Sequence, residues 1–174
     1  MACNFVSVIL NNHKGHIMHL TDLNTVIQKT SSLTRQYASL TLIFNQFHSH
    51  ILTLLESNKY QEWEVEVSDL TDTNDFFIEL AGRKILFIFD IEPDDSETYL
   101  GAISAYMVDD YLYEISEEIA SFTFNSNGLA EDISGLDGDA DLNQDTHCLN
   151  IALAICLSVF DLDLDFELVI DQEW

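Results

Sequence analysis

The stretch GLDGDADLNQD, residues 135–145, places carboxylates on nearly alternate positions. An EF-hand calcium loop has a similar alternation of oxygen ligands, but it also needs Gly at its sixth position and Glu at its twelfth. Counted from Asp137, these positions hold Leu142 and Cys148. The stretch therefore favours a solvated acidic loop. The alternative is a calcium site made by Asp137, Asp139, Asp141 and Asp145.

Other groups that could bind a transition metal or act in catalysis are isolated in the sequence. His13, His16 and His19 are spaced for one side of a helix, but no apolar stripe accompanies them, which favours surface histidines. His147 and Cys148 are neighbours, and neighbouring side chains on a helix point apart. The chain also lacks a glycine-rich phosphate loop and the common hydrolase motifs. We therefore expect neither an enzyme nor a cofactor.

Net charge is the strongest signal in the sequence. The chain has 31 Asp and Glu residues against 6 Lys and Arg, which gives a formal net charge of −25. Residues 85–174 hold 22 of the acids and no Lys or Arg. Solubility of a small domain needs a net charge of only about 2 to 8 in magnitude, and a larger excess destabilises the compact state by self-repulsion. The excess therefore calls for a functional explanation.

Carboxylates line up in two segments, residues 62–67 and 161–168, in which acidic and apolar residues alternate. In a strand these carboxylates fall on one face, about 6.6–6.8 Å apart, which is of the same order as the spacing of phosphates along a nucleic-acid strand. An ordinary exposed strand face mixes charges of both signs. We therefore predict an acidic partner-binding surface that includes Glu62, Glu64, Glu66, Glu114, Glu117, Glu118, Asp161, Asp163, Asp165 and Glu167.

In charge and size, the chain is similar to DNA-mimic proteins and to acidic immunity proteins against nuclease toxins. This resemblance implies a non-enzymatic inhibitor that binds a basic protein, such as a nuclease, a restriction or CRISPR complex, or another nucleic-acid-binding protein. Nucleic acids and membrane surfaces are anionic, so neither is expected as a direct partner. The choice between a mimic and a toxin-specific immunity protein stays open.

The elements that must position these groups begin with a long helix, predicted from an N-cap at Ser31 or Ser32 to about Glu56. Its apolar residues recur at alternating spacings of four and three, and no regular charges flank them. This favours one helix packed on a globular core, with a coiled-coil homodimer as the alternative. His48 and His50 are expected beside the buried face. The stripe consists of Leu33, Tyr37, Leu40, Phe44, Phe47, Ile51 and Leu54.

Residues 62–124 then change to the alternation that is typical of strands, and Gly82 is expected to take a positive φ in a hairpin turn. An antiparallel meander of five or six strands is therefore predicted. The segments are 62–67, 76–80, 85–91, 99–108, 111–115 and 119–124.

A turn-rich loop is expected over residues 125–145, followed by a buried helix over residues 148–160 that Asp145 or Thr146 caps. The alternation over residues 161–168 predicts a final strand.

The predicted fold class is α+β, in a single domain over residues 1–174 whose residues 1–30 could be flexible. Cys3, Cys148 and Cys156 predict no disulfide framework, which suits a reducing compartment. Because the sequence shows neither a basic leader nor a membrane span, we expect a cytoplasmic protein.

Overall fold

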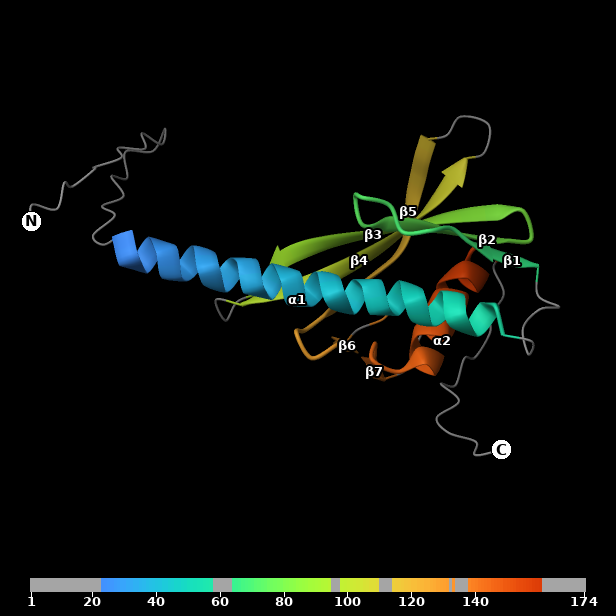
Figure 1. Cartoon of the computed structure of the whole chain (residues 1–174). Coiled ribbons are helices and arrows are strands. Elements are labelled where there is room, and N and C mark those ends of the chain that lie inside the picture. The colour runs from blue at the N-terminus through green and yellow to red at the C-terminus, as the bar shows by residue number, and fades with distance from the viewer. Residues whose placement is uncertain are drawn as a thin grey trace, which may run out of the picture. The chain divides into compact units, whose positions relative to one another are not determined.

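The computed structural model describes residues 23–57, 64–94, 98–109, 114–131, 133 and 138–160 (Figure 1). The chain divides into two units, Met1–Gln36 and Tyr37–Trp174. The elements are α1 (Leu23–Leu55), β1 (Val65–Val67), β2 (Asp75–Leu80), β3 (Arg83–Pro93), β4 (Tyr99–Asp109), β5 (Glu114–Phe124), β6 (Leu129–Glu131), β7 (Ala140–Asp141) and α2 (Asp145–Ser158). The predicted strand over residues 161–168 and the histidines at positions 13, 16 and 19 lie outside the described residues.

The strands form one sheet in sequence order, β1 to β7, and each neighbouring pair is antiparallel. The α+β class and the meander are confirmed, but the described sheet has seven strands where five or six were predicted. β6 and β7 lie inside the predicted loop and span only three and two residues, too few for a visible alternation. Residues 114–115 of the predicted strand 111–115 and the whole predicted strand 119–124 belong to one strand, β5, whose register shifts opposite Tyr106 and interrupts its pattern. Residues 111–113 lie outside the described residues.

Helix α1 begins at Leu23, so the N-cap predicted at Ser31 or Ser32 is wrong. Residues 23–30 contain neither Gly nor Pro, and nothing in them stops the helix. The Thr34 hydroxyl donates a hydrogen bond to the Thr30 carbonyl one turn earlier, 2.9 Å away. The Thr34 side chain is therefore satisfied within the helix.

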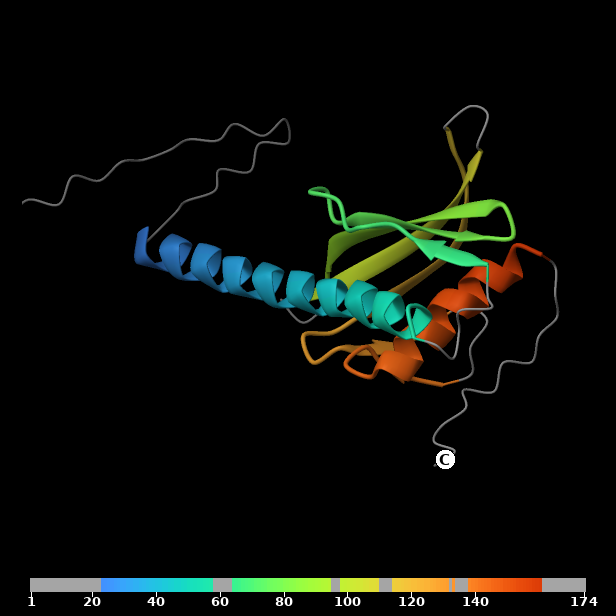
Figure 2. The same cartoon turned by 45° about the vertical axis from the view of Figure 1, so that its right-hand side comes forward.

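The core lies between the inner face of the sheet and the two helices. Figures 1 and 2 show α2 beside the C-terminal part of α1, on the same face of the sheet. Alternate residues of β2 to β5 point to this face and are buried, and Leu40, Phe44, Phe47 and Ile51 of α1 are fully covered. The predicted stripe is confirmed as core packing over this part of the helix.

Helix α2 is the second wall of the core. It was predicted to be apolar all round, and residues 148, 149 and 151–156 are all buried. The predicted cap is displaced by one residue: Gln144 is the N-cap and makes no side-chain capping bond, while Asp145 is the first helical residue. The Asp145 carboxylate instead accepts the backbone N–H of Thr146, 2.8 Å away.

The turn between β2 and β3 follows the prediction. Ala81 and Gly82 have φ values of 49° and 74°, and two consecutive positive φ values are the requirement of a two-residue type I′ hairpin. Gly82 adopts this conformation without strain, whereas Ala81 does so against the preference of an L-residue.

A second glycine is required by packing. Gly101 of β4 pairs with Phe124 of β5, and a Cβ atom at position 101 would lie 2.6 Å from Cε1 of the Phe124 ring. The ring is itself 1% exposed and stacks on Phe89. Because Gly101 has no side chain, the Phe124 ring can lie directly against its backbone.

Within the described ranges, no helix combines the length and the hydrophobicity that a membrane span requires.

We predict that Gly101→Ala lowers the free energy of unfolding by roughly 1–3 kcal/mol, because the added methyl group overpacks the Phe124 ring. Urea denaturation followed by circular dichroism measures the change. In the double variant Gly101→Ala/Phe124→Leu the clash is relieved, so the two effects should not add. Strictly additive effects would contradict this packing.

Candidate functional site

The outer face of the sheet, opposite the helices, is strongly acidic in the described residues. Strand alternation places on it the side chains that neighbour the buried ones along each strand. Its carboxylates are Glu66, Asp75, Glu79, Asp90, Glu92, Glu118, Glu131 and Asp141. Its single described Lys or Arg is Lys84. We call this surface the acidic face.

Like charges face each other across two strands of the acidic face. Glu66 of β1 is directly paired with Glu79 of β2, and both side chains are exposed. Lys84 is paired with Glu79 on the other side, but its Nζ lies 4.7 Å above the centre of the Phe77 ring. Like charges directly opposite in a sheet are destabilising, by the same ~0.2–1 kcal/mol that an attractive pair contributes. The fold tolerates this repulsion instead of avoiding it.

The middle of the acidic face is hollow because the side chains of β4 and β5 are small there. A cavity of about 300 Å³ is open to solvent above Ala102, Ser104, Ser121 and Thr123. Its walls include the carboxylates of Glu92, Glu118 and Glu131. A space with hydroxyls on its floor and carboxylates on its walls offers hydrogen-bond acceptors to a positively charged group.

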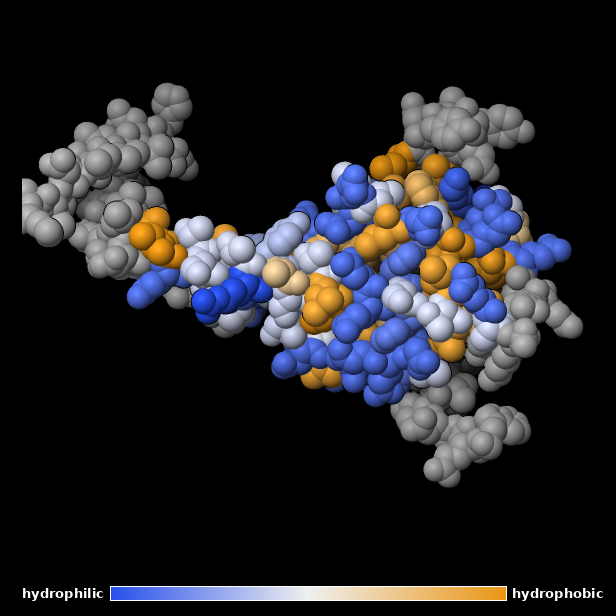
Figure 3. All heavy atoms as spheres, in the orientation of Figure 1, coloured by the Kyte–Doolittle hydropathy of each residue, from blue (hydrophilic) through white to orange (hydrophobic). Residues whose placement is uncertain are grey.

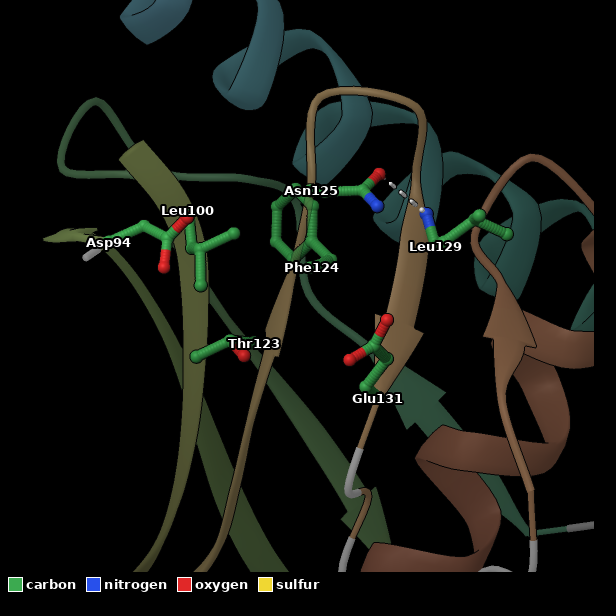
Figure 4. Close-up of a pocket in the computed structure, with 7 residues that line it drawn as sticks. All are labelled: Asp94, Leu100, Thr123, Phe124, Asn125, Leu129 and Glu131. Carbon is green, nitrogen blue, oxygen red and sulfur yellow. Dashed lines mark hydrogen bonds between the residues drawn. The ribbon is translucent and has the colours of Figure 1, made fainter. Parts of the chain in front are cut away.

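A second hollow of about 260 Å³ continues from the first and shares Thr123 and Glu131 with it. Figure 4 shows Asp94 and Glu131 on opposite sides of this space, with Leu100 and Phe124 between them. The Asn125 side chain accepts the backbone N–H of Leu129, 3.3 Å away, which fixes the turn that brings β6 beside β5. Together the two hollows extend the acidic surface from β3 to β6.

The carboxylates of the acidic face are spread out. Across the described part of the chain, no three His, Cys, Asp or Glu side chains come together in a way that could hold a metal ion. Glu118 accepts a hydrogen bond from the Tyr106 hydroxyl at 3.1 Å, which holds its carboxylate at the edge of the first hollow. The described carboxylates of the acidic face are therefore separate hydrogen-bond acceptors and form no single cluster.

Of the predicted partner-binding residues, Glu64, Glu66 and Glu118 are described with exposed side chains. The structure brings Glu66 and Glu118 onto the acidic face. Glu114 and Glu117 belong to β5, but their side chains lie outside the description. Glu62, Asp161, Asp163, Asp165 and Glu167 lie outside the described residues.

Most residues of the acidic face were not predicted from the sequence. Asp90 and Glu92 alternate with the inward-facing Phe89 and Ile91, so this pair could have been found by its alternation. Glu79 and Glu131 are single acids on their strands and carry no local signal. Only the pairing of the strands shows that they share a face with Glu66.

The acidic loop of residues 135–145 is more structured than predicted. Asp137 lies outside the described residues and Asp139 is exposed, but Ala140 and Leu142 are almost fully buried, and β7 runs through the segment. The prediction of a solvated loop is therefore wrong for residues 140–142. These two apolar side chains anchor the segment to the core.

Asp141 has a structural task in this segment. One of its carboxylate oxygens accepts the backbone N–H and the side-chain amide of Asn143, at 3.0 and 2.7 Å. The other accepts the Gln144 amide at 3.4 Å, and the Asn143 amide also reaches the Asn127 carbonyl at 2.7 Å. Asp141 therefore ties the start of α2 to the β5–β6 turn.

The pKa of Asp141 is below its ordinary value. Burial acts to raise this pKa, but the hydrogen bonds from Asn143 and Gln144 and the field of His147 stabilise the carboxylate and outweigh burial. The backbone N–H of Asp141 donates to Nδ1 of His147, 3.0 Å away, which holds the two residues side by side.

The two described cysteines are free and buried, and their surroundings favour the protonated thiol. The Cys148 thiol donates to the Leu142 carbonyl at 3.3 Å, and the imidazole beside it belongs to His50, 3.7 Å away, rather than to His147. Burial, with the charges of Asp145 and Asp141, raises the pKa of Cys148, and burial raises that of Cys156 to about 12. Thiols held in this way stay protonated and unreactive.

The second imidazole of α1, His48, is buried and donates from Nε2 to the Ser68 carbonyl at 2.8 Å. His48 and His50 of α1 thus both lie beside the buried face, as predicted.

The chain matches no protein-family model, no curated protein and no solved structure. Evidence on function therefore comes from the chemistry of the molecule's surfaces. On the side seen in Figure 3, hydrophobic residues lie in small groups separated by hydrophilic ones.

We predict that Asp141→Ala lowers the free energy of unfolding by about 1–2 kcal/mol at pH 7, because it removes a shared hydrogen-bond acceptor. The pKa of Asp141 is lower in the folded state, so its stabilising effect is complete above the pKa of an unfolded Asp and is lost as the pH falls through the folded-state pKa. The difference between wild type and variant should therefore be constant above about pH 5 and shrink below about pH 3.9. Urea denaturation across this pH range measures it.

The matched control is Asp139→Ala, which removes the same charge from an exposed side chain outside this hydrogen-bond network. It should leave stability almost unchanged. A calcium site would give a different result: calcium chloride would raise the melting temperature of the wild type, and both variants would lose that effect.

Proposed function

We propose that the protein is a non-enzymatic inhibitor whose acidic face binds a basic, nucleic-acid-binding surface of another protein. The observation that supports this most directly is the composition of that face, where the described residues set a field of carboxylates against Lys84 alone. A partner with the opposite charge would relieve the repulsion between pairs such as Glu66 and Glu79.

The spacing of the face suits a surface that normally holds phosphates. Neighbouring strands lie about 4.8 Å apart, and alternate residues along one strand lie about 6.6–6.8 Å apart. The carboxylates therefore form a two-dimensional array on a sheet that is already folded. Lys and Arg groups that bind a nucleic-acid backbone could bind such an array without ordering it first.

The hollows could make this binding specific by holding individual side chains of the partner. A Lys or Arg side chain of the partner could enter the space above Ala102 and Thr123 and find Glu92, Glu118 and Glu131 around it. An arginine is favoured there because its planar guanidinium has five donors for carboxylates and hydroxyls. Long-range attraction from a chain of charge −25 would also raise the association rate.

Purification of the tagged protein from its native host, followed by identification of what binds it, tests the proposal. We expect a basic nucleic-acid-binding protein whose complex weakens as salt rises, while salt raises the melting temperature of the inhibitor alone by screening its self-repulsion. Nucleic acid should compete with the inhibitor for the partner. If the partner is a single nuclease toxin and nucleic acid does not displace it from the complex, the protein is an immunity protein instead.

The role of the acidic face is tested with two variants of equal charge. The face variant is Glu79→Gln/Glu92→Gln/Glu131→Gln, and the control variant, Glu56→Gln/Asp69→Asn/Asp72→Asn, changes exposed acids outside the face. We expect the face variant to bind the partner at least tenfold more weakly than the control variant does. Equal affinities, a neutral or acidic partner, or a complex insensitive to salt would contradict the proposal.

A further inference from the structure

The first part of α1 exposes apolar side chains that the acidic face does not explain. Leu33 and Tyr37 are 41% and 50% exposed, and Ile27 is 56% exposed. Leu33 and Tyr37 continue the four-and-three spacing whose later members, such as Leu40 and Phe44, are buried. On the side seen in Figure 3, a hydrophobic group lies at the N-terminal end of the described helix, and mostly pale or hydrophilic residues follow it. The sequence pattern of a buried stripe thus extends beyond the residues that the core covers.

Helix α1 is also the one described element without an acidic residue. Its 33 residues include Lys29 and Arg35 but no Asp or Glu, whereas every described strand and α2 contain at least one acid. In a chain of net charge −25, any other described element would bring carboxylates toward carboxylates if two copies met there. Two copies can approach each other along α1 without this repulsion.

We propose that the first part of α1 pairs with the same segment of a second copy, through Leu33 and Tyr37. A spacing of four and three apolar residues is the pattern that lets two helices pack side by side. An antiparallel arrangement centred on Leu33 keeps each Lys29 away from its counterpart and places it beside Tyr37 of the second copy, where a cation can lie over the ring. The segment is short, so the interface is smaller than the roughly 1,600 Å² of a standard stable complex. We therefore expect a weak, transient dimer.

Sedimentation equilibrium of the full-length protein from about 5 to 500 µM tests the proposal. The wild type should show a monomer–dimer equilibrium that added salt strengthens, because salt screens the repulsion between two acidic copies. This response is opposite to that expected for a complex with a basic partner, so failure of one proposal is distinguishable from failure of the other. A wild type that remains monomeric throughout this range overturns the dimer.

The chain offers a matched control on the same helix. Leu42 is also an exposed leucine, at 58%, but it lies outside the four-and-three spacing. We expect Leu33→Glu to raise the dissociation constant at least tenfold and Leu42→Glu to change it little, with circular dichroism showing that both variants stay helical. Equal effects of the two substitutions would overturn the assignment to this stripe.

A second test of the interface uses disulfide cross-linking and adds no charge to the helix. In a Cys3→Ser background, mild oxidation should cross-link Leu33→Cys into a covalent dimer but leave Leu42→Cys monomeric. Cys148 and Cys156 are buried and do not compete in this reaction. Absence of a cross-link at position 33, or equal cross-linking at both positions, would count against the interface.

Discussion

Phe47 of α1 joins the helix to three strands of the sheet. The centre of its ring lies 6.2, 6.5 and 6.1 Å from the ring centres of Phe76 in β2, Phe87 in β3 and Phe122 in β5. Phe76 and Phe87 also stack on each other at 5.0 Å. Burial of each such ring contributes about 1.5–3 kcal/mol, with up to about 1.5 kcal/mol more for a well-placed aromatic pair. The packing of the helix on the sheet depends on this cluster.

The aromatic core also decides where the charge must go. No carboxylate can enter a layer of phenylalanines without a partner, because the cost of burying an isolated charge exceeds what any of these contacts contributes. The acids of the strands are therefore directed to the outer face, where Glu66 and Glu79 meet. The repulsion of such a pair costs less than one buried ring contributes, so the core can hold a face of like charges together.

Two surfaces of different chemistry result, and each suits a different partner. The acidic face has separated carboxylates around hollows floored by small residues, which suits the cationic side chains of another protein. The first part of α1 has exposed apolar side chains and no acids, which suits a second copy. Salt acts on these surfaces in opposite directions, because it screens an attraction in one case and a repulsion in the other.

The sequence alone determined the elements with a clear period: the stripe from Leu40 to Ile51, the alternating strands β2 to β4, and the apolar helix α2. It also determined the net charge and hence the kind of partner that is electrostatically possible. It could not reveal β6 and β7, because strands of two or three residues show no period. It also misplaced the start of α1, because Ser31 and Ser32 lie within a helix whose preceding residues contain neither Gly nor Pro. Only the tertiary structure decided which acids share a face, because Glu66, Glu79 and Glu131 come together through strand pairing across long stretches of chain. It also assigned Asp141 to a hydrogen-bond network, since the donors of Asn143 and Gln144 reach its carboxylate only once the turn before α2 has formed.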